Sequence, residues 1–358
     1  MKWPSHGSNP RYLYEAMNKE MPAERVDFSA NINPLGPPQE LKVRWNNLFE
    51  YITDYPDPHA SHLKHILAAR EGIKETQILV GNGGAELITL IGRMLAGKKV
   101  LIIQPAFSEY EEACRVNGCM VAYHQLDPET WELDMEALSL KLREADALFF
   151  CNPNNPTGVF YPSAIVKELI ERCRVYNCML VMDEAFYDFV EEYQSIIPII
   201  NSHLHVMVLR SMTKMFSIPG LRLGYLLANE SLIESVSTLK PHWSVNALAL
   251  KAGEWCLESE KHVQLTKKLI KQERERLAHF YRKLEFAVSP SSVNFYLLKD
   301  TKIDNQLPLF QFLLEKGIIP RHTMNFPGLE GEWLRFAIKG PNDNEKLMEA
   351  IKEWRKVR

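Results

Sequence analysis

The sequence predicts an α/β fold: an open, mostly parallel β-sheet covered by helices, followed by a smaller α+β unit. Its short apolar runs are continuous rather than alternating, as expected for strands buried on both faces of a sheet. Helical patterns separate several of these runs, an order typical of a parallel sheet. After about residue 240, long amphipathic helices replace the short apolar strands, which indicates a second unit.

The first part of the chain divides into an arm and a large domain. Residues 1–40 are rich in Pro, Asn and Gly, and we interpret them as an extended arm that packs with the small domain. Residues 41–240 form the large domain, in which an amphipathic helix ends at Gly72. The apolar runs that predict strands are 77–80, 98–104, 145–151, 177–182, 205–211 and 221–229.

Residues 241–358 predict the small α+β domain. The pattern begins with one or two long amphipathic helices and ends with a charged helix. Between them lie a strand over 292–300, a helix over 307–317 and a strand over 332–340.

Composition narrows the classes of function. The 358 residues are 46% hydrophobic and 24% charged with a net charge of −3, so neither a nucleic-acid partner nor a membrane surface is expected. The six cysteines form no C-x-x-C pair and no His cluster accompanies them, so we expect free thiols and no metal site. No apolar leader or membrane span is visible, which favours a cytoplasmic location.

Ligands of α/β sheets gather where the strands end, so the residues that follow each strand are candidates. The stretch 81–85 (GNGGA) leads into a helix, whose exposed backbone N–H groups bind anions; a plain turn is the alternative. Phe107 follows the next strand, with core packing as the alternative. Asn155 lies in the turn 152–158 (NPNNPTG) after the third strand, where asparagine commonly caps the backbone.

Two later strands end near charged residues. Asp183 directly follows an apolar strand, where an acid is costly without a cationic partner; a surface turn is the alternative. Lys214 lies among Met, Phe and Ile residues, with Ser211 and Thr213 before it and Arg222 eight residues after it. A lysine is usually solvated, but burial lowers the pKa of an amine and lets it form a Schiff base.

Together these residues predict a receptor for pyridoxal 5′-phosphate (PLP). They supply backbone donors and an arginine for a phosphate, and an aromatic ring for stacking. They also supply an asparagine for a phenolate, an aspartate for a protonated ring nitrogen and a lysine for an aldehyde. The order of these features along the chain is more specific than any one of them.

With these motifs, the sequence resembles the fold-type I PLP enzymes of the aspartate-aminotransferase superfamily over nearly its whole length. The resemblance implies a mostly parallel seven-stranded sheet. It is nearest to two subfamilies, the L-threonine-O-3-phosphate decarboxylases and the histidinol-phosphate aminotransferases. The stretches similar to the decarboxylases are HGSN (6–9), DFSANINPLGPP (27–38), DEAFYDF (183–189), LRSMTKMFSIPGLRLGYL (209–226), HWSVNALA (242–249) and RHTMNFPGL (321–329).

The resemblance also implies a role for each cofactor residue. Lys214 bonds the cofactor aldehyde and Asp183 pairs with the pyridine nitrogen, so these two are the catalytic residues. Asn155 donates to the phenolate oxygen and Phe107 stacks on the ring. The phosphate is held by Gly83, Gly84, Ala85, Ser211, Thr213 and Arg222, and by Tyr55 from the other subunit of a homodimer with shared sites. Ala85 stands where many relatives have Ser or Thr, so a hydroxyl donor is missing there.

Substrate contacts are implied in the same way. Arg335 matches the superfamily's carboxylate-binding arginine, with a strand-end surface arginine as the alternative. Arg321 and His6 resemble the residues that bind the substrate phosphate in the decarboxylases. Phe186 stands where aminotransferases place a tyrosine. The expected substrate-binding set is His6, Gly7, Asn31, Asn155, Arg321 and Arg335.

We therefore expect decarboxylation of L-threonine O-3-phosphate to (R)-1-aminopropan-2-yl phosphate, which the decarboxylases supply for the cobalamin side chain. The alternative is an aminotransferase of the histidinol-phosphate type, because single residues redirect the reaction in this superfamily. A distant alternative is a PLP-sensing regulatory module without catalysis, which would need a DNA-binding domain ahead of the fold.

Overall fold

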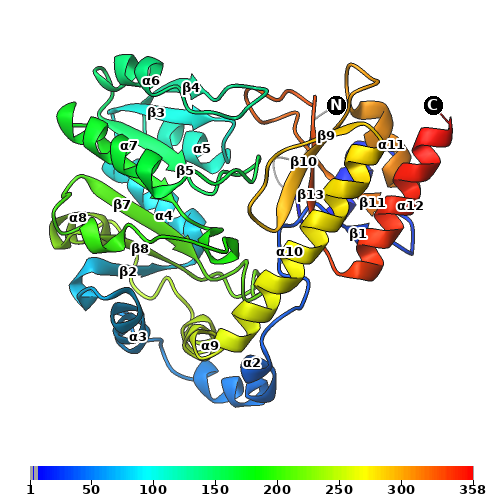
Figure 1. Cartoon of the computed structure of the whole chain (residues 1–358). Helices are drawn as coiled ribbons and strands as arrows, with labels where there is room; N and C mark the ends of the chain where they lie inside the picture. The colour runs from blue at the N-terminus through cyan, green and yellow to red at the C-terminus, as the bar shows by residue number, and fades with distance from the viewer. Residues whose placement is uncertain (1–2, 4–6, 358) are drawn as a thin grey trace.

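The computed structural model describes residue 3 and residues 7–357, and its largest feature is a seven-stranded sheet (Figure 1). The strand order is β2-β8-β7-β6-β5-β3-β4. Only β8 runs antiparallel to its neighbours, so the mostly parallel sheet is confirmed. The strands are β2 (Ile78–Gly81), β3 (Lys99–Gln104), β4 (Met120–Gln125), β5 (Ala147–Cys151), β6 (Met179–Asp183), β7 (Val206–Ser211) and β8 (Gly224–Ala228).

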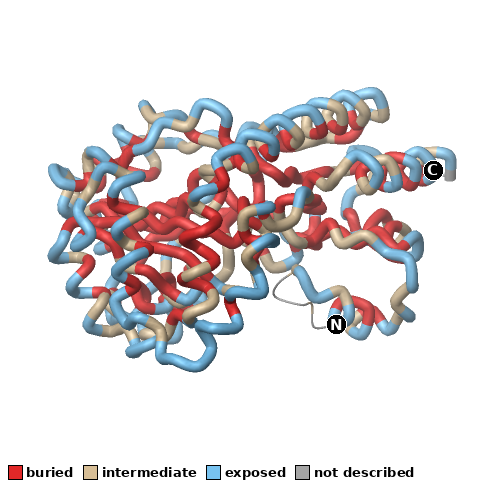
Figure 2. Tube along the Cα trace, turned by 90° about the horizontal axis from the view of Figure 1, so that it is seen from below, coloured by how far each residue is buried: buried red, intermediate tan, exposed pale blue. Residues whose placement is uncertain are grey.

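Helices cover both faces of this sheet, which explains why its central strands are continuously apolar. Side chains of β3, β5, β6 and β7 alternate between two buried clusters, one on each face. One cluster is completed by α4 (Gly83–Met94), α5 (Glu109–Val116) and α8 (Glu230–Ser237). The other is completed by α3 (Ser61–Glu71), α6 (Met135–Leu142), α7 (Ser163–Val175) and α9 (Ala247–Leu257). The sheet is the buried centre of this part of the molecule (Figure 2).

The pairing register brings several strand ends to one edge of the sheet. Cys151 pairs with Asp183, and Ser211 pairs with Gly224. Gly81 at the end of β2 also pairs with Gly224. The polar stretches that follow β2, β5, β6 and β7 therefore begin next to one another.

A four-stranded antiparallel sheet, with order β12-β13-β10-β9, forms the centre of the C-terminal part. The 24-residue helix α10 (Glu260–Lys283) runs from the end that carries α9 toward this sheet (Figure 1). The other elements are β9 (Phe286–Val288), β10 (Phe295–Asp300), α11 (Leu307–Glu315), β11 (Ile318–Ile319), β12 (Arg321–His322), β13 (Leu334–Ala337) and α12 (Pro341–Val357).

The N-terminal segment is less extended than its composition predicts. It contains α1 (Pro10–Ala16), which begins with a proline at a position where the missing N–H costs nothing. Tyr14 of this helix donates a hydrogen bond to the carbonyl of Leu314 at 2.8 Å. The strand β1 (Val26–Asp27) then pairs with β11, so this segment lies against the C-terminal part. The division at residues 40 and 240 stays a proposal.

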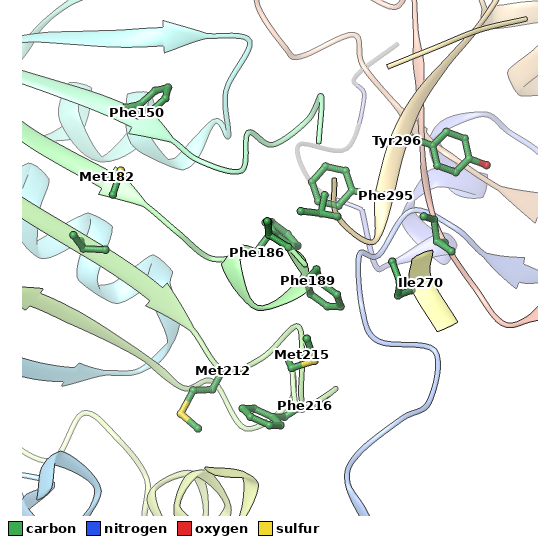
Figure 3. Close-up of a cluster of buried hydrophobic side chains, with 14 of the residues drawn as sticks. Phe150, Met182, Phe186, Phe189, Met212, Met215, Phe216, Ile270, Phe295 and Tyr296 are labelled. Carbon is green, nitrogen blue, oxygen red and sulfur yellow. The ribbon is translucent and has the colours of Figure 1, made fainter. Parts of the chain in front are cut away.

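An apolar cluster joins the two sheets beside the strand ends. The rings of Phe186 and Phe295 lie 4.8 Å apart, and Phe189 lies next to Phe186 (Figure 3). The short helices α2 (Gln39–Val43), η1 (Trp45–Ile52), η2 (Glu75–Gln77), η3 (Tyr187–Phe189) and η4 (Ile197–Ile199) complete the fold. Within the described residues, every helix is too short or too polar to cross a lipid bilayer.

Candidate active site

A cavity of about 330 Å³ lies where the strand ends of the large sheet face the small sheet. Most of the residues singled out in the sequence line it. They are Gly7, Asn31, Gly84, Ala85, Phe107, Asn155, Asp183, Ser211, Thr213, Lys214, Arg222, Arg321 and Arg335.

Two of the expected residues that the structure describes do not line the cavity. Gly83 lies directly behind the cavity, against Arg222. Tyr55 is 83% exposed and its ring lies 5.1 Å from that of Trp243, so it does not reach the cavity of its own chain. His6 lies outside the described residues.

The start of α4 forms a cradle with the shape and charge for an anion. Gly83 has a φ of +75°, and a Cβ at this position would lie 2.6 Å from Nη2 of Arg222. Glycine thus lets the guanidinium approach the helix N-terminus, whose first N–H groups lack acceptors within the helix. The hydroxyls of Ser211 and Thr213 lie 2.8 Å apart in the same cavity. A helix N-terminus, two hydroxyls and a guanidinium together suit a phosphate.

Asp183 ends β6 as a buried carboxylate with a prepared environment. The hydroxyl of Tyr110 donates to Oδ2 at 2.5 Å, and the backbone N–H of Ala185 donates to Oδ1 at 2.8 Å. Burial raises the pKa of Asp183, while these hydrogen bonds and the charge of Lys214 act in the opposite direction. A cationic group in the cavity would stabilise the ionised form.

Lys214 lies three residues beyond the end of β7. Burial lowers the pKa of its amine to about 8, and the positive charges of Arg335 and Arg222 contribute to the shift. In the described part of the chain, no hydrogen bond or ion pair reaches Nζ. An amine with this pKa is partly neutral near pH 7 and is therefore a nucleophile.

Arg321 and Arg335 form a cross-strand pair on the side of the cavity made by the small sheet. Their Cα atoms are direct partners in the register of β12 with β13. Directly opposite side chains lie on one face of a sheet with Cβ atoms about 5 Å apart, where two like charges repel. Burial lowers the pKa of Arg321 to about 10. Burial, followed by the charge of Arg321, lowers the pKa of Arg335 to about 9.

Neutral groups hold Arg335 in place. Its Nη1 donates to Oδ1 of Asn155 at 2.5 Å, and its Nη2 donates to the carbonyl of Ser29 at 2.9 Å. Its Nε is buried and has no partner among the described residues, and the same is true of Oδ1 of Asn31. The guanidinium therefore retains its charge, and its Nε–H stays free to donate to a ligand.

Several functional contacts lie outside the predicted set. Tyr110 hydrogen-bonds Asp183, Ser29 orients Arg335, and the ring of Phe326 lies 5.4 Å from the guanidinium of Arg321. Phe326 is part of the RHTMNFPGL stretch, so the motif contained that signal. Ser29 likewise lies in the DFSANINPLGPP stretch, whereas Tyr110 gave no signal of its own, because its partner Asp183 is distant in sequence.

Comparisons with known proteins agree with this architecture. The aminotransferase class I and II family matches residues 23–351. A threonine-phosphate decarboxylase from Salmonella typhimurium is 35% identical over 354 residues, which cover 97% of this chain and 96% of that protein.

Solved structures from the two subfamilies are similar to this chain as well. The histidinol-phosphate aminotransferase from Clostridium acetobutylicum has a TM-score of 0.86 at 29% identity, covering 92% of this chain and 99% of that chain. The L-threonine-O-3-phosphate decarboxylase from Porphyromonas gingivalis has a TM-score of 0.82 at 26% identity, covering 91% and 98%.

The fold and the cavity define the class of protein: an aspartate-aminotransferase-like enzyme of fold-type I, the architecture of PLP-dependent catalysis. More specifically, the chain belongs to the aminotransferase class I and II family.

Proposed function

We propose that the protein is a PLP-dependent lyase that converts L-threonine O-3-phosphate into (R)-1-aminopropan-2-yl phosphate and CO2. The cross-strand pair of Arg321 and Arg335, buried beside Lys214, is the observation that carries this proposal. The 35% identity to a threonine-phosphate decarboxylase supports it.

The residues around the cavity fit PLP. The start of α4, with Gly83, Gly84 and Ala85, would hold the phosphate together with the residues on either side of Lys214. Ala85 contributes only its backbone there. Lys214 would bond the aldehyde and Asp183 would hold the ring nitrogen. The full cofactor set is Gly83, Gly84, Ala85, Phe107, Asn155, Asp183, Ser211, Thr213, Lys214 and Arg222, with Tyr55 from a second subunit.

The arginine pair fits a compact substrate with two anionic groups. L-threonine O-3-phosphate carries its carboxylate and its phosphate ester on adjacent carbons. Two guanidiniums on directly opposite residues match two anions at such a short separation, because each forms bidentate contacts with carboxylate or phosphate. Histidinol phosphate has only one anionic group and carries an imidazole ring. A pair of arginines does not match this combination of groups.

Different residues of the chain serve different steps of the proposed reaction. Bound PLP supplies an electron-deficient ring that takes up the electron pair of a bond broken at the substrate Cα. Arg335 holds the carboxylate, so that the bond from Cα to the carboxylate is the one that breaks and CO2 leaves. Lys214, in its ammonium form, then donates one proton from Nζ to Cα and becomes a neutral amine, a transfer for which a pKa of about 8 is well suited. Phe186 adds no hydroxyl to this wall of the cavity.

Product analysis tests the proposal. The purified protein with PLP and L-threonine O-3-phosphate is expected to release CO2 and the amino-propanol phosphate in equal amounts. Lys214→Ala is expected to abolish both products and the visible absorbance of the lysine-bound cofactor. The similarity to histidinol-phosphate aminotransferases defines the opposing result: transfer of an amino group from histidinol phosphate to 2-oxoglutarate, without release of CO2, would refute decarboxylation.

We also propose a homodimer in which each subunit completes the other's site. Large apolar side chains lie exposed on and near η1: Trp45 is 49% exposed, Phe49 73% and Ile52 55%. Tyr55 and Trp243 extend this surface as an aromatic pair whose rings are tilted by 41° to each other. A patch of this kind marks a protein interface.

A cytoplasmic location is proposed as well, since all six cysteines are free thiols.

Mixing two impaired variants tests the shared site. One subunit carries Lys214→Ala and the other carries Tyr55→Ala. If Tyr55 serves the neighbouring subunit, the mixed dimer contains one intact site and recovers about half of the wild-type activity per dimer. If Tyr55 acted within its own chain, mixing would restore nothing.

A further inference from the structure

Asn33 is a buried polar residue whose contacts lie in the turn that carries Lys214. It is 3% exposed, and its backbone N–H donates to the carbonyl of Lys214 at 3.1 Å. Its side-chain Nδ2 donates to the carbonyl of Met215 at 2.7 Å and to Oγ1 of Thr266 at 2.7 Å. One residue thus holds two successive carbonyls of the turn and links them to α10.

The hydrogen bonds around Asn33 are consistent with only one orientation of its side-chain amide. Its amide carries two hydrogens, and Thr266 has to accept one of them because its own hydroxyl donates to the carbonyl of His262 at 2.8 Å. The carbonyl of Met215 accepts the other. His262 Nε2 lies 3.0 Å from the amide nitrogen. Oδ1 of Asn33 accepts from the N–H of Leu35 at 2.9 Å, so the orientation of the amide is fixed.

The position of the Lys214 amine depends on this turn. Since no described group hydrogen-bonds Nζ, the backbone and the apolar neighbours decide where the side chain starts. Met212, Met215 and Phe216 anchor the turn on one side by packing into the apolar cluster (Figure 3). The turn's own bonds are few: Ile218 N–H to the Thr213 carbonyl at 3.1 Å, and a long one of 3.4 Å from Ser217 to Lys214.

The same short segment also holds the arginine that faces Lys214. Arg335 donates to the carbonyl of Ser29, four residues before Asn33. The backbone N–H of Phe28 donates to the carbonyl of Ile319 in β11 at 2.9 Å, and its carbonyl accepts from Ala337, two residues after Arg335 in β13, at 2.8 Å. Residues 28–33 therefore form a continuous bridge from the guanidinium to the turn of the amine.

We propose that Asn33 is a positioning residue that sets the distance between the Lys214 amine and the anion-binding arginines. It acts through the backbone of residues 214 and 215 and does not touch the reacting atoms. The inference rests on the proposed function, because that function gives Lys214 its role. An apolar side chain would be sufficient for packing here, whereas a buried amide is retained only at the cost of satisfying each of its polar groups.

The variant Asn33→Asp tests the proposal, with Asn342→Asp on the exposed start of α12 as the matched control. Aspartate keeps the shape and the acceptor for Leu35 but removes both amide donors. In the cofactor-free protein, amide exchange over residues 212–218 is expected to become about 10-fold faster or more, with β5 and β6 unchanged. Exchange at the control's rate, or acceleration across the whole chain, would overturn the proposal.

Kinetics and a rescue pair give a second, independent readout. Thr266→Val removes the hydroxyl that accepts the hydrogen bond from Nδ2 of Asn33, whereas Thr266→Ser retains this hydroxyl. In Asn33→Asp and Thr266→Val, kcat is expected to fall about 10-fold or more while KM changes less, and Thr266→Ser restores kcat. Equal losses in the valine and serine variants would overturn the role of this bond. Because exchange is measured without substrate, failure of the decarboxylase assay would not be mistaken for failure of this inference.

Discussion

Two buried arginines near the same strand ends have opposite surroundings. Arg210, in β7, is 1% exposed and pairs with Glu71 at 2.6 Å and Glu184 at 2.9 Å, and its guanidinium lies 3.9 Å from the ring of Tyr187. Burial alone would lower its pKa, but Glu184 and the other acidic groups around it raise the pKa well above the usual value. The charge of Arg210 is compensated within the fold.

Arg335 is nearly as buried, but its guanidinium donates only to neutral acceptors, the amide oxygen of Asn155 and the backbone carbonyl of Ser29. No carboxylate lies within ion-pair distance of it in the described part of the chain, and its pKa is lowered to about 9 by burial and by Arg321. The difference separates an arginine that stabilises the fold from one that is prepared for a ligand, because an uncompensated buried charge persists only where function needs it.

The largest effect is expected for the stability of the fold when Arg210, the arginine with a compensated charge, is replaced. Arg210→Met removes a cation that serves Glu71 and Glu184 at once, so two buried acids lose their partner. The free energy of unfolding is expected to fall by about 3 to 5 kcal/mol. Denaturant unfolding measures it, with Arg174→Met as the control. Arg174 is exposed and pairs with Glu171, so its loss costs about 0.5 kcal/mol or less. Equal unfolding midpoints for both variants would show that the Arg210 network does not stabilise the fold.

Arg335→Met is expected to show the reverse pattern, loss of activity without loss of stability. Removing one preorganised charged donor costs about 10²- to 10³-fold in kcat/KM. The ligand-free variant is expected to unfold at the same denaturant concentration as the wild type or a higher one, because a repulsive buried charge is gone. The measurements are product formation from L-threonine O-3-phosphate and denaturant unfolding of the same preparations. A destabilised variant with unchanged kcat/KM would remove the distinction between the two arginines.

The same contrast explains what could be predicted from the sequence. Asp183 and Lys214 could be predicted because Asp183 directly follows an apolar run and Lys214 lies three residues beyond the end of another. In a parallel sheet such strand ends meet at one edge. The pairing of Arg321 with Arg335 could not be predicted from the sequence, because β12 has only two residues and its register is set by tertiary packing. Glu71 and Glu184 reach Arg210 from separate elements, so no local pattern marks that network.

β4 and α1 are among the elements that were missed, and the reasons are similar. β4 lies at the sheet edge and is only partly buried, so its sequence lacks the continuous apolar run of the central strands. In α1, the flanking Pro and Asn residues dominate the composition, although its buried Leu13 and Tyr14 decide where it packs. Asn33 lies in a motif that was recognised, but its contacts with Met215 and Thr266 depend on the tertiary fold.

The smallest expected effect concerns Lys214, a third buried cation, in the cofactor-free protein. Its folded-state pKa of about 8 is below the 10.5 of the unfolded chain, so between these values the unfolded state binds more protons and stability rises with pH. Below pH 8 the full penalty applies, at most about 3 kcal/mol. Lys214→Met is therefore expected to unfold at a higher denaturant concentration than the wild type at pH 7, with the difference shrinking from pH 8 to 10. Lys268→Met, at an exposed position of α10, controls for loss of a charge. A stability difference that does not change with pH would mean that the Lys214 amine is solvated like a surface lysine.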